Sequence, residues 1–276
     1  MLTVSSPRSP GVFEHPVAPF PLWLVCSSFL MSKQRLDQHL VDTGHFPSRA
    51  RARDAILRGT VSVNGAVCGK PAQKVAADAP ISVEDPAAGY VSRAALKLIE
   101  GLRAFNVTPV DKICLDIGAS TGGFTQVLLQ NGATRVHAID VGHDQLHDKL
   151  RRDPRVIAQD GLNARELTQE HLGGDRPKLL VSDVSFISLK LALPPALDLA
   201  APRADGIFLV KPQFEAGKDK IGKGGLVDPE IAEATAKHLQ DWLGTVPGWT
   251  AGDLIPSPVK GGDGNAEWLL YGKKAA

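Results

Sequence analysis

The chain has 276 residues, of which 43% are hydrophobic and 22% are charged, a composition typical of soluble globular proteins. The net charge of +1 excludes a uniformly basic protein, and no apolar run reaches the roughly 18 residues that a membrane span requires. Cys26, Cys68 and Cys114 show no spacing typical of a disulfide framework or a zinc site. We therefore expect a cytoplasmic protein of one large or two unequal domains, without a membrane partner.

The first segment, residues 1–32, differs from the rest of the chain in its residue pattern. It contains the proline-interrupted apolar stretch VAPFPLWLVCSSFL, with only Arg8 as positive charge upstream. A signal peptide requires a basic start, an uninterrupted apolar centre and a cleavage site of small residues. We expect residues 1–32 to be a disordered leader or an extension from an upstream start, with Met31 as a natural start.

Residues 33–85 show the pattern of a small α+β domain. Apolar spacing in RLDQHLVDTG predicts one helix, and Ser48 is placed to cap a second, RARARDAILRG. An alternating strand follows in TVSVNGAVC, where Asn64-Gly65 predicts a two-residue hairpin turn, and ISVED (81–85) predicts a closing strand. The apolar stripe of the second helix is expected at Ala50, Ala55, Ile56 and Leu57.

Positive charge is concentrated in the same segment. From Lys33 to Pro80, eight lysines and arginines stand against four acids, so this stretch carries +4 and the remainder −3, which favours a polyanionic partner. Two arginine-bearing helices followed by a hairpin with V-N-G resemble the S4 RNA-binding domain. The resemblance implies phosphate contacts, which we expect from Arg35, Arg49, Arg51, Arg53 and Arg58. Residues 86–90, PAAGY, are the expected linker.

Strands and helices alternate in residues 91–276, the expected second domain. VSRAALKLIEGLRAF predicts a helix capped by Ser92. Buried strands are predicted at residues 113–117, 136–139, 156–158, 179–182 and 207–210, with two more near 253–256 and 267–271. Such alternation predicts an α/β fold with a seven-stranded, mostly parallel sheet covered by helices on both faces.

A glycine-rich stretch, CLDIGASTGGFTQVLLQNG, occupies residues 114–132. A buried strand ends near Asp116, the glycines permit a sharp turn and the close approach of a ligand, and a helix begins near Phe124. Asp140 ends the next strand, where its carboxylate can accept hydrogen bonds from ribose hydroxyls. Asp160 follows the third strand and is placed to contact an adenine amino group.

The order G-A-S-T-G-G differs from the G-x-G-x-x-G of dinucleotide sites. An acid two residues before the first glycine suits the cationic tail of S-adenosylmethionine better than a pyrophosphate. A nicotinamide cofactor and a plain tight turn stay open as alternatives. The residues expected to bind S-adenosylmethionine are Asp116, Gly118, Ala119, Ser120, Thr121, Gly122, Gly123, Phe124, Asp140, Asp160 and Asp183.

Four polar residues stand at separate motifs further along the chain. They are Lys97 in SRAALKL, Asp183 in LLVSDVSF, Lys211 in FLVKPQFE and Glu267 in GNAEWLLY. Because the carboxyl ends of parallel strands form the ligand crevice of such sheets, Asp183 and Lys211 should face the same pocket as the glycine-rich loop. The alternative for Lys211 is a lysine that simply reaches solvent at a strand end.

Together, S-R-A-A-x-K-L, D-I-G-A-S-T-G-G-F-T, S-D-V-S-F-I-S, L-V-K-P-Q-F-E and G-N-x-E-W resemble the TlyA/haemolysin A family over residues 33–273. The resemblance implies an FtsJ-like, Rossmann-like methyltransferase domain that depends on S-adenosylmethionine, fused to an S4 domain. It also implies that ribosomal RNA or ribosomal subunits are the partner, and that a cytidine ribose 2′-hydroxyl is methylated. The implied catalytic tetrad is Lys97, Asp183, Lys211 and Glu267.

The chemistry of this reaction agrees with these residue types. Methyl transfer from a sulfonium to a hydroxyl is an in-line displacement with a neutral leaving group, so we expect no metal. Lys211 is expected to accept the hydroxyl proton or, if it stays charged, to stabilise the developing alkoxide. Asp183 and Glu267 would orient the lysines and the hydroxyl, and Lys97 would orient the ribose and tune Lys211.

Two other functions stay open. A non-catalytic RNA-binding or ribosome-assembly factor should show replacements in the tetrad. A membrane-active haemolysin would need a secretion signal and an insertion segment.

Overall fold

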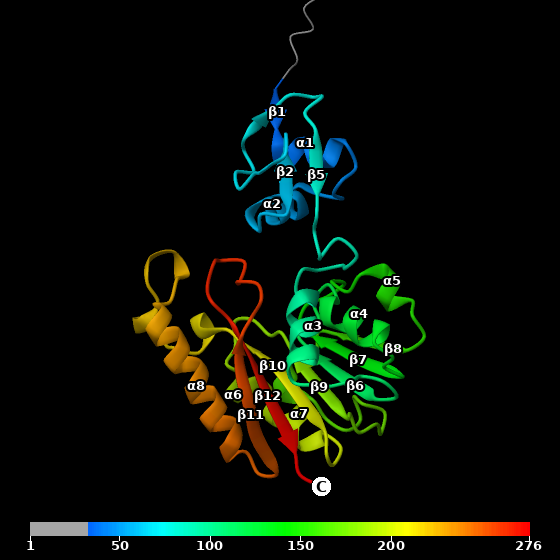
Figure 1. Cartoon of the computed structure of the whole chain (residues 1–276). Coiled ribbons are helices and arrows are strands. Elements are labelled where there is room, and N and C mark those ends of the chain that lie inside the picture. Colours follow the sequence, from blue (N-terminus) through cyan, green and yellow to red (C-terminus); the bar gives the residue numbers. More distant parts are fainter. Residues whose placement is uncertain (1–32) are drawn as a thin grey trace, which may run out of the picture. The chain divides into compact units, whose positions relative to one another are not determined.

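The computed structural model describes residues 33–276, apart from the side chain of Lys218, and the chain divides after Asp85 into two compact units (Figure 1). The leader expected at residues 1–32 lies outside the described residues. In the described part of the chain, no helix is long and apolar enough to cross a membrane.

The first unit packs two helices against short strands. Helices α1 (Leu36–Asp42) and α2 (Arg49–Leu57) cover an antiparallel sheet in which β2 (Val61–Val63) lies between β3 (Ala66–Val67) and β5 (Ile81–Val83). Asn64 and Gly65 both have positive φ, 52° and 78°, so the predicted two-residue turn is confirmed. The sequence did not predict the pairing of β1 (Gln34–Arg35) with β4 (Lys74–Val75).

Helix α2 begins where its cap predicts, and its buried face agrees with the predicted stripe only at Ala55 and Ile56. The Ser48 hydroxyl accepts a hydrogen bond from the Arg51 N–H at 3.4 Å. The buried residues are Ala52, Ala55 and Ile56, whereas Ala50 is exposed and Leu57 is 59% exposed. Leu57 lies roughly 200° around the helix from Ala55, because each residue advances about 100°. The predicted stripe was therefore wrong at Ala50 and Leu57.

Within residues 86–276, seven strands form one sheet in the order β11-β12-β10-β9-β6-β7-β8. Strand β12 runs antiparallel to both its neighbours, and the β10-β9-β6-β7-β8 portion is parallel, which confirms the mostly parallel sheet. The strands are β6 (Ile113–Ile117), β7 (Arg135–Asp140), β8 (Val156–Asp160), β9 (Leu179–Ser182), β10 (Asp205–Val210), β11 (Trp249–Pro256) and β12 (Trp268–Lys274).

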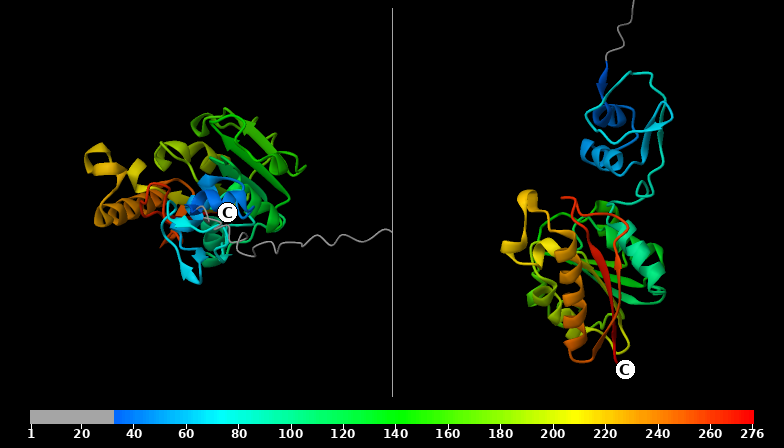
Figure 2. Two further views of the ribbon diagram at one scale, coloured as in Figure 1. Left: turned by 90° about the horizontal axis from the view of Figure 1, so that it is seen from above. Right: turned by 60° about the vertical axis from the view of Figure 1, so that its left-hand side comes forward.

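Helices cover both faces of this sheet (Figures 1 and 2). On one face, α3 (Ala95–Ala104), α4 (Gly123–Gln130) and α5 (Asp148–Arg151) pack on alternate strand residues such as Cys114. On the other, α6 (Leu189–Ala192), α7 (Pro194–Leu199) and α8 (Pro229–Thr245) pack on the intervening ones, such as Leu115. Short 3₁₀ helices lie at η1 (Ala164–Glu166), η2 (Pro212–Phe214), η3 (Lys218–Lys220) and η4 (Lys223–Gly225).

Helix α3 begins later than its sequence predicts. The Ser92 hydroxyl does accept a hydrogen bond, from the Ala94 N–H at 3.2 Å, but regular helix begins only at Ala95. The preceding residues form turns. As a result, Lys97 lies in the first turn of α3, and it is buried.

Candidate active site

The candidate site lies at the carboxyl edge of the parallel strands. Asp183 follows β9 and Lys211 follows β10, so both emerge at this edge. Strand β12 runs the other way, and its first residue, Trp268, pairs with Val210. This register places Glu267 beside Lys211, and α3 packs on both β10 and β12 to add Lys97.

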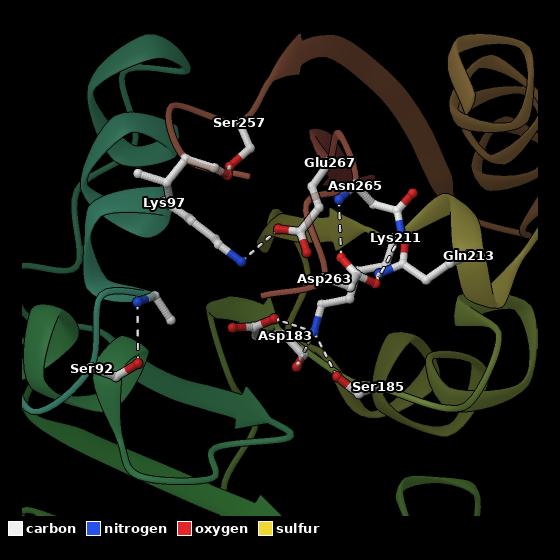
Figure 3. A network of polar contacts seen from close by, with 12 residues as sticks. Ser92, Lys97, Asp183, Ser185, Lys211, Gln213, Ser257, Asp263, Asn265 and Glu267 are labelled. Atoms are coloured by element: carbon white, nitrogen blue, oxygen red, sulfur yellow. Dashed lines mark hydrogen bonds and ion pairs between the residues drawn. The ribbon is translucent and has the colours of Figure 1, made fainter. Parts of the chain in front are cut away.

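Two ion pairs join the four residues predicted as a tetrad (Figure 3). Lys97 Nζ lies 2.5 Å from Glu267 Oε2, and Lys211 Nζ lies 2.7 Å from Asp183 Oδ1. The first pair is enclosed, with Lys97 5% and Glu267 4% exposed. Burial raises the pKa of Glu267, although the neighbouring Lys97 charge opposes the shift. The structure thus brings the four residues together, while their catalytic roles stay a prediction.

Lys211 is surrounded by acceptors. Besides the Asp183 carboxylate, its ammonium donates to the Ser185 hydroxyl at 2.7 Å and to the main-chain oxygen of Asp183 at 3.3 Å (Figure 3). Among the described residues, these three acceptors match the three N–H donors of a charged lysine. Sequence reasoning missed Ser185, although it stands in the quoted motif S-D-V-S-F-I-S.

At Gly118 the glycine-rich loop packs closely on the backbone of Val184, which follows β9. Gly118 has φ +80°, and a Cβ there would lie 3.1 Å from Val184 Cα and 3.2 Å from Val184 N. The Asp140 carboxylate accepts hydrogen bonds from the Ser120 N–H at 2.8 Å and the Gly142 N–H at 2.7 Å. These bonds hold the loop after β6 against the loop after β7. Gly118 thus allows the loop after β6 to pack directly on the loop after β9.

Two of the cavities in the described part of the chain meet at this loop. The larger, about 1140 Å³, is lined by Asp140 and Val141 at one side and by Phe186 and Phe214 at another. The smaller, about 140 Å³, runs along the loop to Lys211. Gly118, Ser120 and Asp183 line both. Of the other predicted cofactor-binding residues, those lining one cavity are Ala119, Thr121, Gly123, Phe124 and Asp140.

Asp116 does not reach either cavity wall. It is fully buried on the α4 side of β6, where its Oδ2 accepts a hydrogen bond from the Thr125 hydroxyl at 2.6 Å. Its Oδ1 has no hydrogen-bond partner among the described residues. Burial raises the pKa of this carboxyl to about 7, and the Asp183 and Asp140 charges add to the shift. Direct contact between Asp116 and a cofactor is therefore not what this geometry offers.

Gly122 and Asp160 also lie outside the cavity linings. Gly122 has φ +94°, and a Cβ there would lie 2.4 Å from a Leu150 methyl, so this glycine serves packing. Asp160 accepts hydrogen bonds from Arg151 at 2.7 Å and from the Asp144 N–H at 3.2 Å. The Arg151 guanidinium lowers the pKa of Asp160. Its contact with adenine stays a prediction.

The arginines of the first unit have two different environments. Arg35 and Arg49 are about half exposed, and both pair with the buried Asp37, at 2.9 Å and 3.1 Å. Hydrogen bonding from Arg35 lowers the pKa of Asp37 to about 2. Arg53 is exposed and Arg51 is half-buried.

Arg58 departs from the expected phosphate-binding role. Its guanidinium is paired with Asp85 at 2.7 Å and with Asp54 at 2.9 Å, and its side chain is only 14% exposed. It ties the end of α2 to the residues that follow β5. We interpret Arg58 as a structural residue of this unit.

Comparisons with known protein families give one match for each of the two units. A model of FtsJ-like methyltransferases matches residues 90–274, and an S4 domain model matches residues 34–81. The chain belongs to the FtsJ-like methyltransferase family. It is 43% identical over 245 residues to the 16S/23S rRNA (cytidine-2′-O)-methyltransferase TlyA of Mycobacterium tuberculosis, covering 87% of this chain and 89% of that one.

Two further similarities extend over both units. The chain is 39% identical to Hemolysin A of Brachyspira hyodysenteriae, over 86% of this chain and 98% of that protein. A solved structure from Streptococcus thermophilus, which carries a provisional hemolysin name, matches with a TM-score of 0.69 and 38% identity. That match covers 89% of this chain and 90% of the other. The expected fold, an S4 domain followed by an FtsJ-like α/β methyltransferase domain, is thereby confirmed.

Proposed function

We propose that the protein uses S-adenosylmethionine to methylate a ribose 2′-hydroxyl of ribosomal RNA, on a cytidine. The observation that carries the proposal is the Lys211–Asp183 ion pair beside the glycine-rich loop, where Asp183 lines the same cavities as Gly118 and Ser120. The name of the Mycobacterium tuberculosis relative supports the choice of nucleotide and of 2′-oxygen.

The glycine-rich loop and Asp140 are the residues that would hold the cofactor. Gly118 lines both cavities, and the Asp140 carboxylate, which lines the larger one, is already oriented by two backbone N–H groups. When bound, S-adenosylmethionine would supply a methyl group on a sulfonium whose leaving group departs neutral. Asp116 would act from behind, by fixing the start of α4 through Thr125.

Lys211 would handle the charge that develops on the ribose oxygen. Three acceptors surround Lys211 Nζ, as suits an ammonium group. In the reaction this ammonium would release its hydrogen bond to Ser185 and donate to the developing alkoxide instead. The hydroxyl proton would pass to the adjacent Asp183 carboxylate. The Lys97–Glu267 pair lies next to Lys211 and would orient the ribose. Much of the rate enhancement would come from holding the ribose 2′-oxygen and the methyl carbon in line with each other.

The two units would divide recognition and chemistry. Residues 33–85 would bind ribosomal RNA or ribosomal subunits in the cytoplasm through Arg35, Arg49, Arg51 and Arg53, and residues 91–276 would carry the reaction, joined by the 86–90 linker. Phosphate contacts position an RNA but do not read its sequence. Choice of nucleotide would therefore rest with the catalytic unit and the fold of the RNA.

The test is methyl transfer from labelled S-adenosylmethionine to RNA of unmodified ribosomal subunits. We compare wild type with Lys211→Ala, and use Lys237→Ala as control, because Lys237 is an exposed lysine on α8 that pairs with the exposed Glu233 at 2.7 Å. We expect Lys211→Ala to lower kcat at least about 100-fold, the range typical of a lost proton-transfer or oxyanion-stabilising group.

The affinity of each variant for S-adenosylmethionine should show whether a loss of activity comes from the methyl transfer step or from cofactor binding. We expect both variants to bind S-adenosylmethionine as wild type does, because neither lysine is among the residues that would hold it. Equal activity of wild type and Lys211→Ala would contradict the proposed role. Absence of transfer to any ribosomal RNA by the wild type would contradict the proposed function itself.

A further inference from the structure

Two neighbouring loops each begin with one residue of the Lys211–Asp183 pair. Lys211 holds the start of the loop after β9, through Asp183 and Ser185. Four residues later, Glu215 holds the end of that same loop. Its Oε2 accepts a hydrogen bond from the Ser188 hydroxyl at 2.6 Å, and its Oε1 accepts one from the Leu189 N–H at 2.7 Å. Residues 211–215 therefore clamp residues 183–189 at both ends.

The middle of the clamped loop is strained. Phe186 has φ +64°, in the left-handed region that bulky residues rarely adopt. Its side chain is 90% exposed, and its ring centre lies 4.9 Å from that of Phe214, one residue before Glu215. Such a conformation persists only where the surrounding structure over-determines it. The hydrogen bonds at the two ends of the loop supply that constraint.

Capping of α6 explains only part of the role of Glu215, whose Oε1 accepts the N–H of Leu189, the first residue of that helix. The Ser188 hydroxyl already accepts a hydrogen bond from the Lys190 N–H at 3.2 Å, as an N-cap serine does. Glu215 is half-buried, and burial raises its pKa, so holding a carboxylate there has a desolvation cost. What the carboxylate adds is a link between the segment that starts at Lys211 and the segment that starts at Asp183.

We propose that Glu215 is a positioning residue for the Lys211–Asp183 pair. It acts by fixing the far end of the 183–189 loop, so that Asp183 and Ser185 present their oxygens to Lys211. It touches neither the reacting atoms nor the glycine-rich loop. This inference rests on the proposed function, because it assigns Glu215 to the same reaction.

The experiment uses the full chain and four variants. Glu215→Ala removes both bonds, and Ser188→Ala removes one of them. Glu215→Gln keeps an acceptor for the Leu189 N–H and can donate to the Ser188 oxygen, so it should rescue much of the function. Glu233→Ala is the matched control, because Glu233 is an exposed glutamate on α8 paired with Lys237. We measure kcat, KM for RNA, S-adenosylmethionine affinity and amide hydrogen exchange.

We expect Glu215→Ala to lower kcat about 10- to 100-fold, since misplacement of a catalytic group by about 1 Å has effects of that size. S-adenosylmethionine affinity should stay within about twofold, and hydrogen exchange should rise in residues 184–190 but not in 118–130. Glu215→Gln should recover most of the lost kcat, and Ser188→Ala should fall between.

Three outcomes would overturn the inference. The first is a kcat of Glu215→Ala within about twofold of the control. The second is a parallel loss of activity and cofactor affinity, which indicates general unfolding. The third is unchanged exchange in residues 184–190. If Glu215→Ala does not fold, a kcat of Ser188→Ala within about twofold of the control overturns it equally. Lack of transfer by the wild type would instead remove the proposed function, and this inference with it.

Discussion

Asp116 shows how a single buried carboxyl can make the stability of the fold depend on pH. Its carboxyl is fully buried between β6 and α4, accepts a hydrogen bond from Thr125, and has its pKa raised from 3.8 to about 7. Below about pH 4 the folded and unfolded states both carry the proton. Between about pH 4 and 7 only the folded state keeps it, so the free energy of unfolding falls as the pH rises. Above about pH 7 the loss is complete.

Asp116→Asn should remove this pH dependence. Asparagine can still accept the Thr125 hydrogen bond, but it does not titrate. We expect the stability of the variant relative to wild type to rise between pH 4 and 7, by up to about 4 kcal/mol, from roughly 1.4 kcal/mol per pKa unit. Urea unfolding at several pH values measures this difference. Parallel pH profiles for the two proteins would contradict the shift.

At the scale of elements, the loop between β6 and α4 has no room for a side chain at Gly118 without a shift of its surroundings. Gly118→Ala would place a methyl group 3.0 Å from a Val184 methyl in a residue with φ +80°. We expect S-adenosylmethionine affinity to fall at least about 10-fold, because the loop must shift away from Val184 and so change the lining of the cavity. Calorimetric titration measures the affinity.

The matched control for that substitution is Gly69→Ala. No atom lies within 4 Å of a Cβ built at Gly69, and its φ is not in the left-handed region. The control should bind the cofactor as wild type does. An affinity of Gly118→Ala within about twofold of the control would show that the loop tolerates a side chain there.

Strands were the most predictable elements. The predicted bounds 113–117 and 179–182 coincide with β6 and β9, because the polar residues that flank a short apolar run mark where a buried strand begins and ends. Asp183 and Lys211 were predictable together because both follow parallel strands, whose carboxyl ends meet at one edge of the sheet. The grouping of all four residues came from the resemblance to the TlyA/haemolysin A family, since Lys97 lies on helix α3. Glu267 joins that edge because β12 is antiparallel.

Other features depend on tertiary structure that sequence patterns do not report. Asp116 points to the α4 side because it alternates with Leu115 and Ile117, and only the packed sheet shows which side lines the cavity. Ser185 and Glu215 contact their partners across a loop whose path depends on Phe186 at positive φ, and no propensity predicts that conformation for phenylalanine.

At the scale of the whole molecule, charge in the first unit and chemistry in the second should separate experimentally. Arg49→Ala and Arg53→Ala remove exposed positive charge from α2. We expect each to weaken RNA binding and to reduce the salt dependence of the affinity by about one counterion, whatever the RNA sequence. KM for RNA should rise while kcat stays unchanged. Filter binding over a range of salt concentrations measures the slope.

Arg58→Ala is the informative contrast in the same helix. Its guanidinium pairs with Asp54 and Asp85, so its removal leaves two carboxylates without this partner. We expect a loss of roughly 3 kcal/mol in stability, as for a broken buried ion pair, with little change in the salt slope. A salt slope that changes as much as for Arg53→Ala would restore Arg58 to the RNA-binding set.

The most direct test of the central claim is the position of the transferred methyl group. Ribosomal RNA from unmodified subunits, treated with the full chain and S-adenosylmethionine, is digested to nucleosides and oligonucleotides and analysed by mass spectrometry. The account predicts a methyl group on the ribose 2′-oxygen of a cytidine, absent after treatment with Lys211→Ala. A methyl group on a base would keep the cofactor but contradict the role given to Lys211, Asp183, Lys97 and Glu267.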